Sequence, residues 1–307
     1  MSFKALPDQL ATVTDILSTW QQGTQDIAQV DGSVKSPFFR NVAASLAVAG
    51  DPKMVNVGNA EITAKFMSKL PPPLYPFTVD AAAADRGKEI FAKNCAACHR
   101  THTDVVYKTE LIGTDPNRAR VLNADGLALF LRHFVAAVPE NYEATDAGGA
   151  KYKPRDMAPS DILFDRSAPE NQGYVTNALE GLWARGPYLH NGAVPTVYHV
   201  LVPSSRPATF VRGAVSYDKK NIGFDWDAAK LESLRGTFPT AAIFDTSRDS
   251  ASRLGHDTNL TIDDKGHIIK KGWDGDARPG ELRVRLDWAG ADNQPALSAL
   301  IEYLKTL

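Results

Sequence analysis

The segment RGKEIFAKNCAACHR, residues 86–100, contains both cysteines of the chain, Cys95 and Cys98, and His99 follows directly. Cys-x-x-Cys-His is the pattern that attaches a c-type haem. Near the end of a helix, residues three apart lie on one face, so both thiols can reach the two vinyl groups of one porphyrin. His99 is then carried beneath the iron as its proximal ligand. The motif therefore predicts one covalent haem c, attached through Cys95 and Cys98.

Two other uses of a Cys-x-x-Cys pair are a zinc half-site and a redox-active dithiol. A structural zinc ion needs four Cys or His ligands at suitable spacing, and beyond the nearby His102 the sequence has no second cluster. A thioredoxin-like dithiol needs a strand-to-helix setting, whereas here the motif follows a helical segment. Haem attachment is the interpretation that the residues favour.

The flanks of the motif predict a helix that crosses another helix. VDAAAADRGKEIFAKN is rich in alanine, and Asp80 is placed to cap its start. Gly87, Phe91 and Cys95 are four residues apart and lie on one ridge. The C-terminal segment NQPALSALIEYLKTL has helical periodicity and offers Tyr303 as a matching surface.

Length and charge limit the class of protein. The 307 residues suffice for one large domain or two modest ones, and 34 Lys and Arg against 36 Asp and Glu give no basic field for nucleic acid. No apolar run approaches the roughly 20 residues that span a bilayer. The N-terminus lacks the pattern of a secretory signal. Because c-type haem is normally attached outside the bacterial cytoplasm, we expect a periplasmic or secreted protein whose exported start is trimmed or missing.

The sequence predicts a mostly α fold: a cytochrome c-like helical domain with long irregular insertions and a few short strands. Residues 1–78 form an N-terminal helical segment that ends in the proline-rich connector KLPPPLYPF. Residues 79–307 form the cytochrome c domain, with an insertion at about 140–290. No internal repeat is evident.

The residues alone leave the sixth iron ligand open. His190 lies in the turn GPYLHNG, His256 lies in a polar loop, and Met157 is the one methionine downstream of the motif. The choice matters because methionine raises the reduction potential, a second histidine lowers it and an open position allows small molecules to bind. Arg185 and Tyr188, beside His190, are expected to contact a haem propionate or the haem edge.

A family resemblance bears on this choice. The run GLWARGPYLHNGAVPTVYHVLVPSSRPATFVRG, with YDKKNIGFDW after it, resembles the C-terminal part of the rubber oxygenase-like di-haem cytochromes c. These are relatives of the bacterial di-haem cytochrome c peroxidases. The segments LPPPLYPFTVDAAAADRGKEIFAKNCAACH and LIEYLKTL fit the same family in the same order. The resemblance implies that His256 is the distal ligand opposite His99, which gives a six-coordinate electron-transfer iron.

The resemblance also sets the functional alternatives. The family has two haem motifs, and its catalytic haem belongs to the N-terminal half, whereas this chain has one motif. We therefore expect a cytochrome that transfers single electrons to a redox partner protein or a second haem domain. We assign no catalytic residues. The alternatives are a peroxidase- or oxygenase-like haem enzyme, and a remnant that acts as partner module of another haem subunit.

Overall fold

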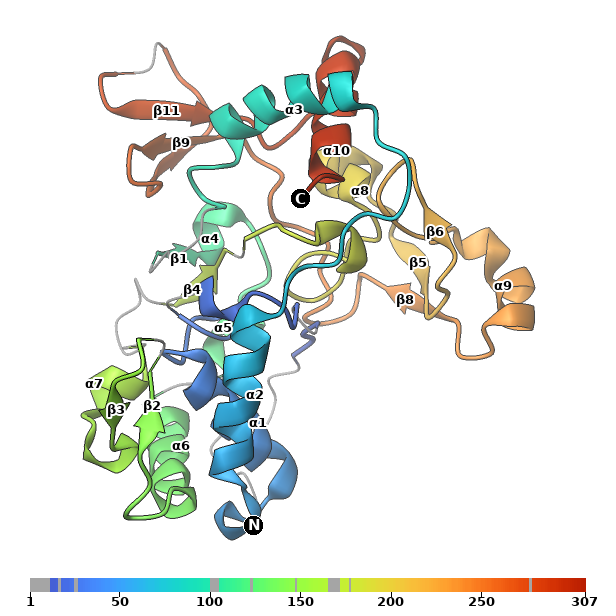
Figure 1. Cartoon of the computed structure of the whole chain (residues 1–307). Coiled ribbons are helices and arrows are strands. Elements are labelled where there is room, and N and C mark those ends of the chain that lie inside the picture. The colour runs from blue at the N-terminus through green and yellow to red at the C-terminus, as the bar shows by residue number, and fades with distance from the viewer. Residues whose placement is uncertain are drawn as a thin grey trace.

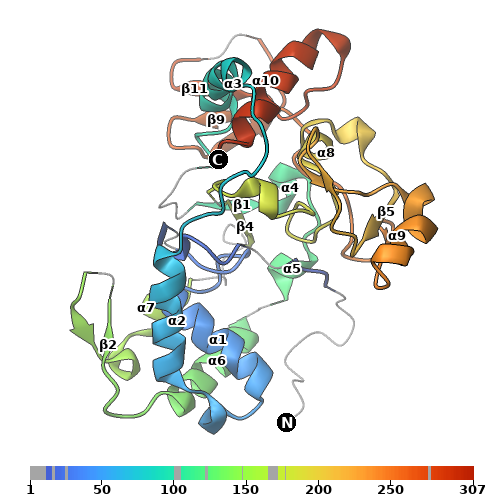
Figure 2. The same ribbon diagram turned by 45° about the vertical axis from the view of Figure 1, so that its right-hand side comes forward.

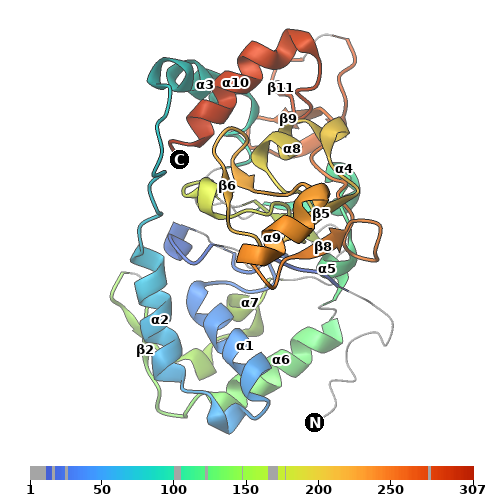
Figure 3. The ribbon, with the colours of Figure 1, turned by 90° about the vertical axis from the view of Figure 1, so that its right-hand side faces the viewer.

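The computed structural model describes residues 12–15, 18–24, 27–99, 105–121, 124–146, 148–164, 172–176, 178–275 and 278–307. Within these ranges the chain forms two lobes, with α1, α2 and α6 in one and α3, α8 and α10 in the other (Figures 1 and 3). The helices are α1 (Pro37–Ala49), α2 (Val57–Lys69), α3 (Ala81–Asn94), α4 (Thr109–Ile112), α5 (Asn117–Arg120), α6 (Ala124–Ala137), α7 (Pro159–Ile162), α8 (Val197–Leu201), α9 (Leu231–Thr237) and α10 (Gln294–Leu304).

In the part of the chain that the structure describes, the strands are short and pair in five small antiparallel sheets, β1–β4, β2–β3, β5–β8, β6–β7 and β10–β9–β11. They are β1 (Val106–Lys108), β2 (Ala144–Thr145), β3 (Lys151–Tyr152), β4 (Gly173–Val175), β5 (Thr209–Arg212), β6 (Tyr217–Asp218), β7 (Gly223–Phe224), β8 (Ala242–Asp245), β9 (Leu260–Asp263), β10 (Ile268–Lys271) and β11 (Glu281–Val284). The prediction of a mostly α fold is therefore confirmed only in part. The long insertion contains the expected short strands, some paired in hairpins such as β6–β7 and others between distant segments such as β5–β8.

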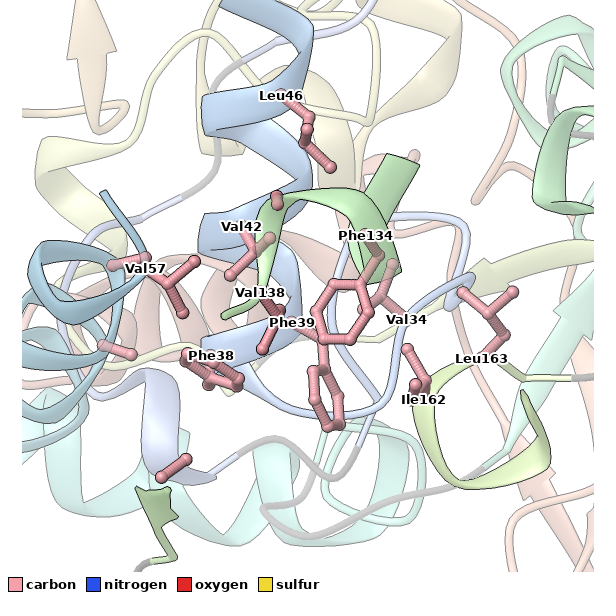
Figure 4. Close-up of a cluster of buried hydrophobic side chains, with 14 of the residues drawn as sticks. Val34, Phe38, Phe39, Val42, Leu46, Val57, Phe134, Val138, Ile162 and Leu163 are labelled. Carbon is pink, nitrogen blue, oxygen red and sulfur yellow. The ribbon is translucent and has the colours of Figure 1, made fainter. Parts of the chain in front are cut away.

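One hydrophobic core lies between α1, α2 and α6 (Figure 4). Ser36 begins α1 by accepting a hydrogen bond from the Phe39 N–H at 3.4 Å, and Pro37 occupies the first helical position. Phe39 then meets Phe134 of α6 edge to face, with ring centroids 5.5 Å apart. This core combines residues from both sides of position 78, and the predicted domain boundary there stays a prediction.

The second lobe is organised by the crossing of α3 and α10, which Figures 1 and 2 show lying across one another. Asp80 caps α3 as expected, accepting from the Ala83 N–H at 3.0 Å. At the crossing point a Cβ on Gly87 would lie 2.0 Å from the Ala299 carbonyl oxygen, so only glycine fits. Phe91 and Tyr303 pack one turn further on, with ring centroids 5.2 Å apart. The expected helix crossing is confirmed.

The same turn occurs in both lobes, over residues 28–36 and 188–196. In each turn the first N–H donates to the carbonyl of the seventh residue at 2.6 Å, and a serine or threonine caps the following helix. The matching positive φ angles are 71° at Gln29 and 67° at Leu189, and 66° at Gly32 and 64° at Gly192. The two turns thus share one backbone conformation up to the capping residue, where φ is 95° at Ser36 and −139° at Thr196.

The correspondence extends to the helix that closes each lobe. The Gln21 N–H donates to Leu70 O, just beyond α2, at 3.0 Å, and the Gly181 N–H donates to Leu307 O, just beyond α10, at 2.7 Å. The chain therefore contains an internal structural repeat in which α2 is the counterpart of α10. No repeat was evident in the sequence because the backbone dictates only a few positions, the αL glycine and the capping hydroxyl among them.

Candidate haem site

The two cysteines lie on a hydrogen-bonded turn that begins where α3 ends. The Cys95 N–H donates to Phe91 O at 2.8 Å, and the N–H groups of Cys98 and His99 both donate to Cys95 O, at 3.1 and 2.9 Å. The Thr176 hydroxyl donates to Cys98 O at 2.5 Å and ties the turn to the end of β4. The turn is thus held at both ends, with the cysteines and His99 at the wall of a cavity.

The cavity has a volume of about 300 Å³. Its wall is mostly apolar, which suits a flat hydrophobic ligand. Side chains from α3, α8, α10, β9, β10 and β11 contribute to it, namely Phe91, Val197, Val200, Leu201, Leu304, Leu260, Ile268 and Val284.

His99 and His256 face one another across this cavity. Their ring centroids are 6.3 Å apart and their planes are inclined by 52°. Two metal–imidazole bonds of about 2 Å, plus the distance from each nitrogen to its ring centre, add to about 6 Å. A separation of 6.3 Å would therefore allow both imidazoles to hold one iron.

The environment of His256 keeps its imidazole neutral. Burial lowers the pKa of His256 to about 3, with smaller contributions from the nearby His99 and Arg206 charges. Its Nδ1 is buried and has no hydrogen-bond partner. A neutral imidazole is the form that binds a metal.

The loop that carries His256 is fixed by backbone contacts. The His256 N–H donates to Ile112 O at 3.1 Å. His256 itself has a φ of 61°, and the preceding Gly255 has a φ of 115°. A Cβ on Gly255 would lie 2.6 Å from the Thr114 Cβ, so glycine is required where the loop passes the α4–α5 connection.

Arg206 holds the same loop from the other side. Its buried guanidinium donates to Arg253 O at 2.6 Å and Gly255 O at 2.8 Å. It also donates to His199 O at 2.8 Å and Val200 O at 3.1 Å, which joins the loop to α8. Burial lowers the pKa of Arg206 to about 10, and the group stays charged at neutral pH. Sequence reasoning missed Arg206, because nothing in SSRPATF marks an arginine whose acceptors are distant carbonyls.

The turn around His190 supports this loop as well. The Asn191 side-chain amide donates to Ser250 O at 3.1 Å and Ser252 O at 2.9 Å. His190 lines the cavity and stacks on Tyr174, with ring centroids 4.1 Å apart. Its Nε2 is buried without a partner, and burial lowers its pKa to about 4, with a smaller contribution from Arg118.

The remaining predicted residues are divided between the two lobes. Arg185 and Tyr188 both line the cavity. Arg185 donates to Ala178 O at 2.7 Å, and the Tyr188 hydroxyl donates to Leu182 O at 3.2 Å. Met157 instead packs against the core of the other lobe, away from the cavity.

The cysteines themselves do not suit the two other uses of the motif. Burial, with a contribution from Cys98, raises the pKa of the Cys95 thiol to about 12, whereas a reactive dithiol needs a depressed pKa. Among the residues that the structure describes, no group of three or more His, Cys, Asp or Glu side chains could hold a metal ion. Two thiols beside an apolar cavity, with two imidazoles facing across it, fit a covalent haem.

Comparison with known proteins gives the class of the domain and supports the family resemblance. A cytochrome c family model matches residues 84–166, and a family model described as RoxA-like, cytochrome c-like, matches residues 173–211. The chain therefore contains a cytochrome c domain, whose class binds haem covalently and transfers electrons. The match to the RoxA-like, cytochrome c-like model confirms the resemblance noted in the sequence. In the described ranges, no helix is long and apolar enough to cross a membrane.

Two relatives come from Sinorhizobium fredii (strain NBRC 101917 / NGR234). The uncharacterized protein y4iM is 44% identical over 297 residues, which covers 96% of this chain and 65% of the relative. The uncharacterized protein y4iJ is 24% identical, over 79% of this chain and 49% of its own length. The chain spans less than two thirds of the length of either relative.

Proposed function

We propose that this chain is a mono-haem electron-transfer cytochrome in which His99 and His256 are the two axial ligands of the iron. The observation that carries the proposal is the 6.3 Å separation of the two imidazole rings across the cavity. Cys95 and Cys98 are the covalent attachment points at the same wall.

The chain's own residues would serve this function in three ways. His99 and His256 would both hold the haem iron, which would leave peroxide or oxygen no free coordination site. The apolar wall excludes water and stabilises an unchanged geometry in both redox states. Arg206 and Asn191 hold the His256 loop, which keeps the distal ligand in place. The haem, when bound, supplies reversible one-electron chemistry at a potential that two histidines keep low.

We place the protein in the periplasm or outside the cell, because covalent haem attachment takes place there. Its partner in this proposal is a redox protein or a second haem domain that exchanges single electrons with the exposed part of the haem.

The test is to produce the chain in a bacterial periplasm together with the haem c maturation machinery. We expect one haem per chain by mass and by the spectrum of its pyridine complex, and a reversible one-electron titration. The double variant Cys95→Ser/Cys98→Ser is the matched control and should carry no covalent haem. Sustained turnover of peroxide by the wild type would contradict the proposal in favour of the enzyme alternative. Failure to take up haem would leave only the partner-module alternative.

A further inference from the structure

A second cavity lies in the insertion and shares part of its wall with the haem cavity. Its volume is about 160 Å³. Pro187 lines both cavities, and the rest of the second wall comes mainly from β5, from the loop that follows β5, and from residues in and next to β7. The proposed electron transfer makes no use of this second cavity.

The second cavity has a buried floor and an exposed rim. Phe210, Val211 and Ala214 line it and are at most 4% exposed. Val215 lines it as well but is 65% exposed. A small molecule can therefore reach the cavity from solvent, while its inner end is enclosed by core residues.

Three aromatic side chains, those of Phe210, Phe224 and Trp226, line the second cavity. Neighbouring rings hold two of them in place. Trp226 meets His199 edge to face with ring centroids 4.7 Å apart, and Phe224 meets Tyr217 in the same way at 5.7 Å. An apolar cavity of about 150 Å³ is large enough to bind benzene. The size of the cavity and its aromatic wall therefore suit one six-membered aromatic ring.

The charge of the wall favours an anionic ligand. Among the described residues that line the second cavity, Arg212 is the one charged side chain. Its Cζ lies 5.0 Å from the centre of the Phe244 ring. Its hydrogen bond to Asp15 is long, at 3.4 Å, and Asp15 lies outside this wall. In the part of the chain that the structure describes, Arg212 donates to no other acceptor, so its remaining N–H groups can bind a ligand.

A backbone group adds a second donor. Ala214 is 4% exposed, and within the described ranges its N–H has no hydrogen-bond acceptor. Buried N–H groups without an acceptor are rare in folded proteins. An oxygen atom of a ligand in the cavity would supply the missing acceptor. The two donors together favour a carboxylate, which a planar guanidinium binds through two parallel hydrogen bonds.

We propose that the second cavity binds a small aromatic carboxylate with a single ring. The ring lies among Phe210, Phe224 and Trp226, and the carboxylate accepts hydrogen bonds from Arg212. A ligand with two fused rings and a carboxylate exceeds the volume of about 160 Å³. This inference goes beyond the proposed electron-transfer function and does not depend on the axial ligands.

The test is isothermal titration calorimetry of the purified chain with benzoate, benzyl alcohol and acetate. We expect saturable binding of benzoate at one site. Benzyl alcohol has the ring without the charge and should bind at least tenfold more weakly, and acetate has the charge without the ring and should not bind measurably. Arg212→Gln should weaken benzoate about tenfold or more and leave benzyl alcohol unchanged, because only the anion needs the guanidinium.

Arg248→Gln is the matched control, since Arg248 is exposed and does not line the cavity. It should bind both ring compounds as the wild type does. Ala214→Leu fills the cavity and should abolish the binding of both; if this variant does not fold, the comparison of Arg212→Gln with Arg248→Gln decides. The inference is overturned if the wild type does not bind benzoate, if it binds acetate or benzyl alcohol equally well, or if Arg212→Gln and Arg248→Gln bind benzoate with the same affinity.

Discussion

His256 has a backbone conformation that a histidine rarely adopts, with a φ of 61° directly after a glycine at 115°. Such strain persists only where the surroundings enforce it. Here two guanidinium hydrogen bonds from Arg206, the Ile112 carbonyl and the close approach of Thr114 do so. The imidazole thereby lines the cavity although its Nδ1 has no hydrogen-bond partner.

Replacing Arg206 by lysine tests this support. An ammonium cannot reach four carbonyls arranged around a planar guanidinium, so part of the His256 loop is released. We expect a loss of about 2 kcal/mol in the free energy of unfolding and a new high-spin fraction in the EPR spectrum of the oxidised protein. Arg248→Lys, at an exposed position in the same loop, is the control and should change neither quantity. An unchanged spectrum for Arg206→Lys would show that the loop holds His256 without it.

Gly255→Ala probes the same loop through sterics. The new Cβ would lie 2.6 Å from the Thr114 Cβ, and the positive φ adds strain. We expect a destabilisation of about 2 kcal/mol or more in chemical denaturation. Gly236→Ala in α9 meets nothing within 4 Å and should be neutral or stabilising by up to about 1 kcal/mol. Equal denaturation midpoints for the two variants would disprove the steric account.

At the scale of elements, the α3–α10 crossing controls the position of the haem motif. Gly87→Ala places a methyl group 2.0 Å from the Ala299 carbonyl oxygen and forces the helices apart. We expect a loss of about 3 kcal/mol and less haem bound per chain, measured by denaturation and by absorbance. Gly58→Ala in α2 is the control: its only close neighbour is Asn56 Oδ1 at 3.5 Å, so stability and haem content should be kept. Full haem content in Gly87→Ala would mean that the motif does not need the close crossing.

A carboxylate joins α2 to the hairpin β2–β3. Burial raises the pKa of Glu61, but hydrogen bonds from Lys65, Tyr142 and the Thr145 N–H outweigh it and lower the pKa overall. A lowered native pKa adds stability that is complete above the unfolded pKa of about 4.3 and is lost as the pH falls through the native value.

We therefore expect Glu61→Gln to melt at a lower temperature than the wild type at pH 7, and the difference to shrink as the pH falls below about 4. Melting followed by circular dichroism from pH 7 to pH 3 measures this. Glu143→Gln, whose ion pair with Lys151 is largely exposed, should show little difference at any pH. A gap between Glu61→Gln and the wild type that stays constant with pH would contradict the assignment.

At the scale of the whole molecule, the sequence predicted the parts that are governed by local rules. The Cys95–His99 motif, the capped helix α3 and the Gly87 crossing follow from spacing and from close helix packing. The place of Arg206 could not be predicted, because its acceptors are carbonyls brought together only by the fold. The repeat was not evident in the sequence for a related reason. Asp31 and Asn191 occupy matching turn positions, but they are different residue types whose common feature is a side-chain oxygen that accepts a backbone N–H two residues later.

The repeat also explains the shape of the molecule (Figure 1). One lobe joins its closing helix α10 to the haem-motif helix, and the other leaves the matching face of α2 open in the part of the chain that the structure describes. The two lobes thus differ at one helix face, which α3 covers on α10 and which is exposed on α2 at Ile62 and Phe66.

The most direct test of the axial pair is the EPR and visible spectrum of the oxidised, haem-loaded protein. The account predicts a low-spin bis-histidine signal in the wild type, conversion to high spin in His256→Ala, and a retained low-spin signal in His190→Ala, which changes the other buried histidine of the cavity. A wild-type iron that is high-spin and binds cyanide readily, or a His256→Ala spectrum identical to the wild type, would contradict it.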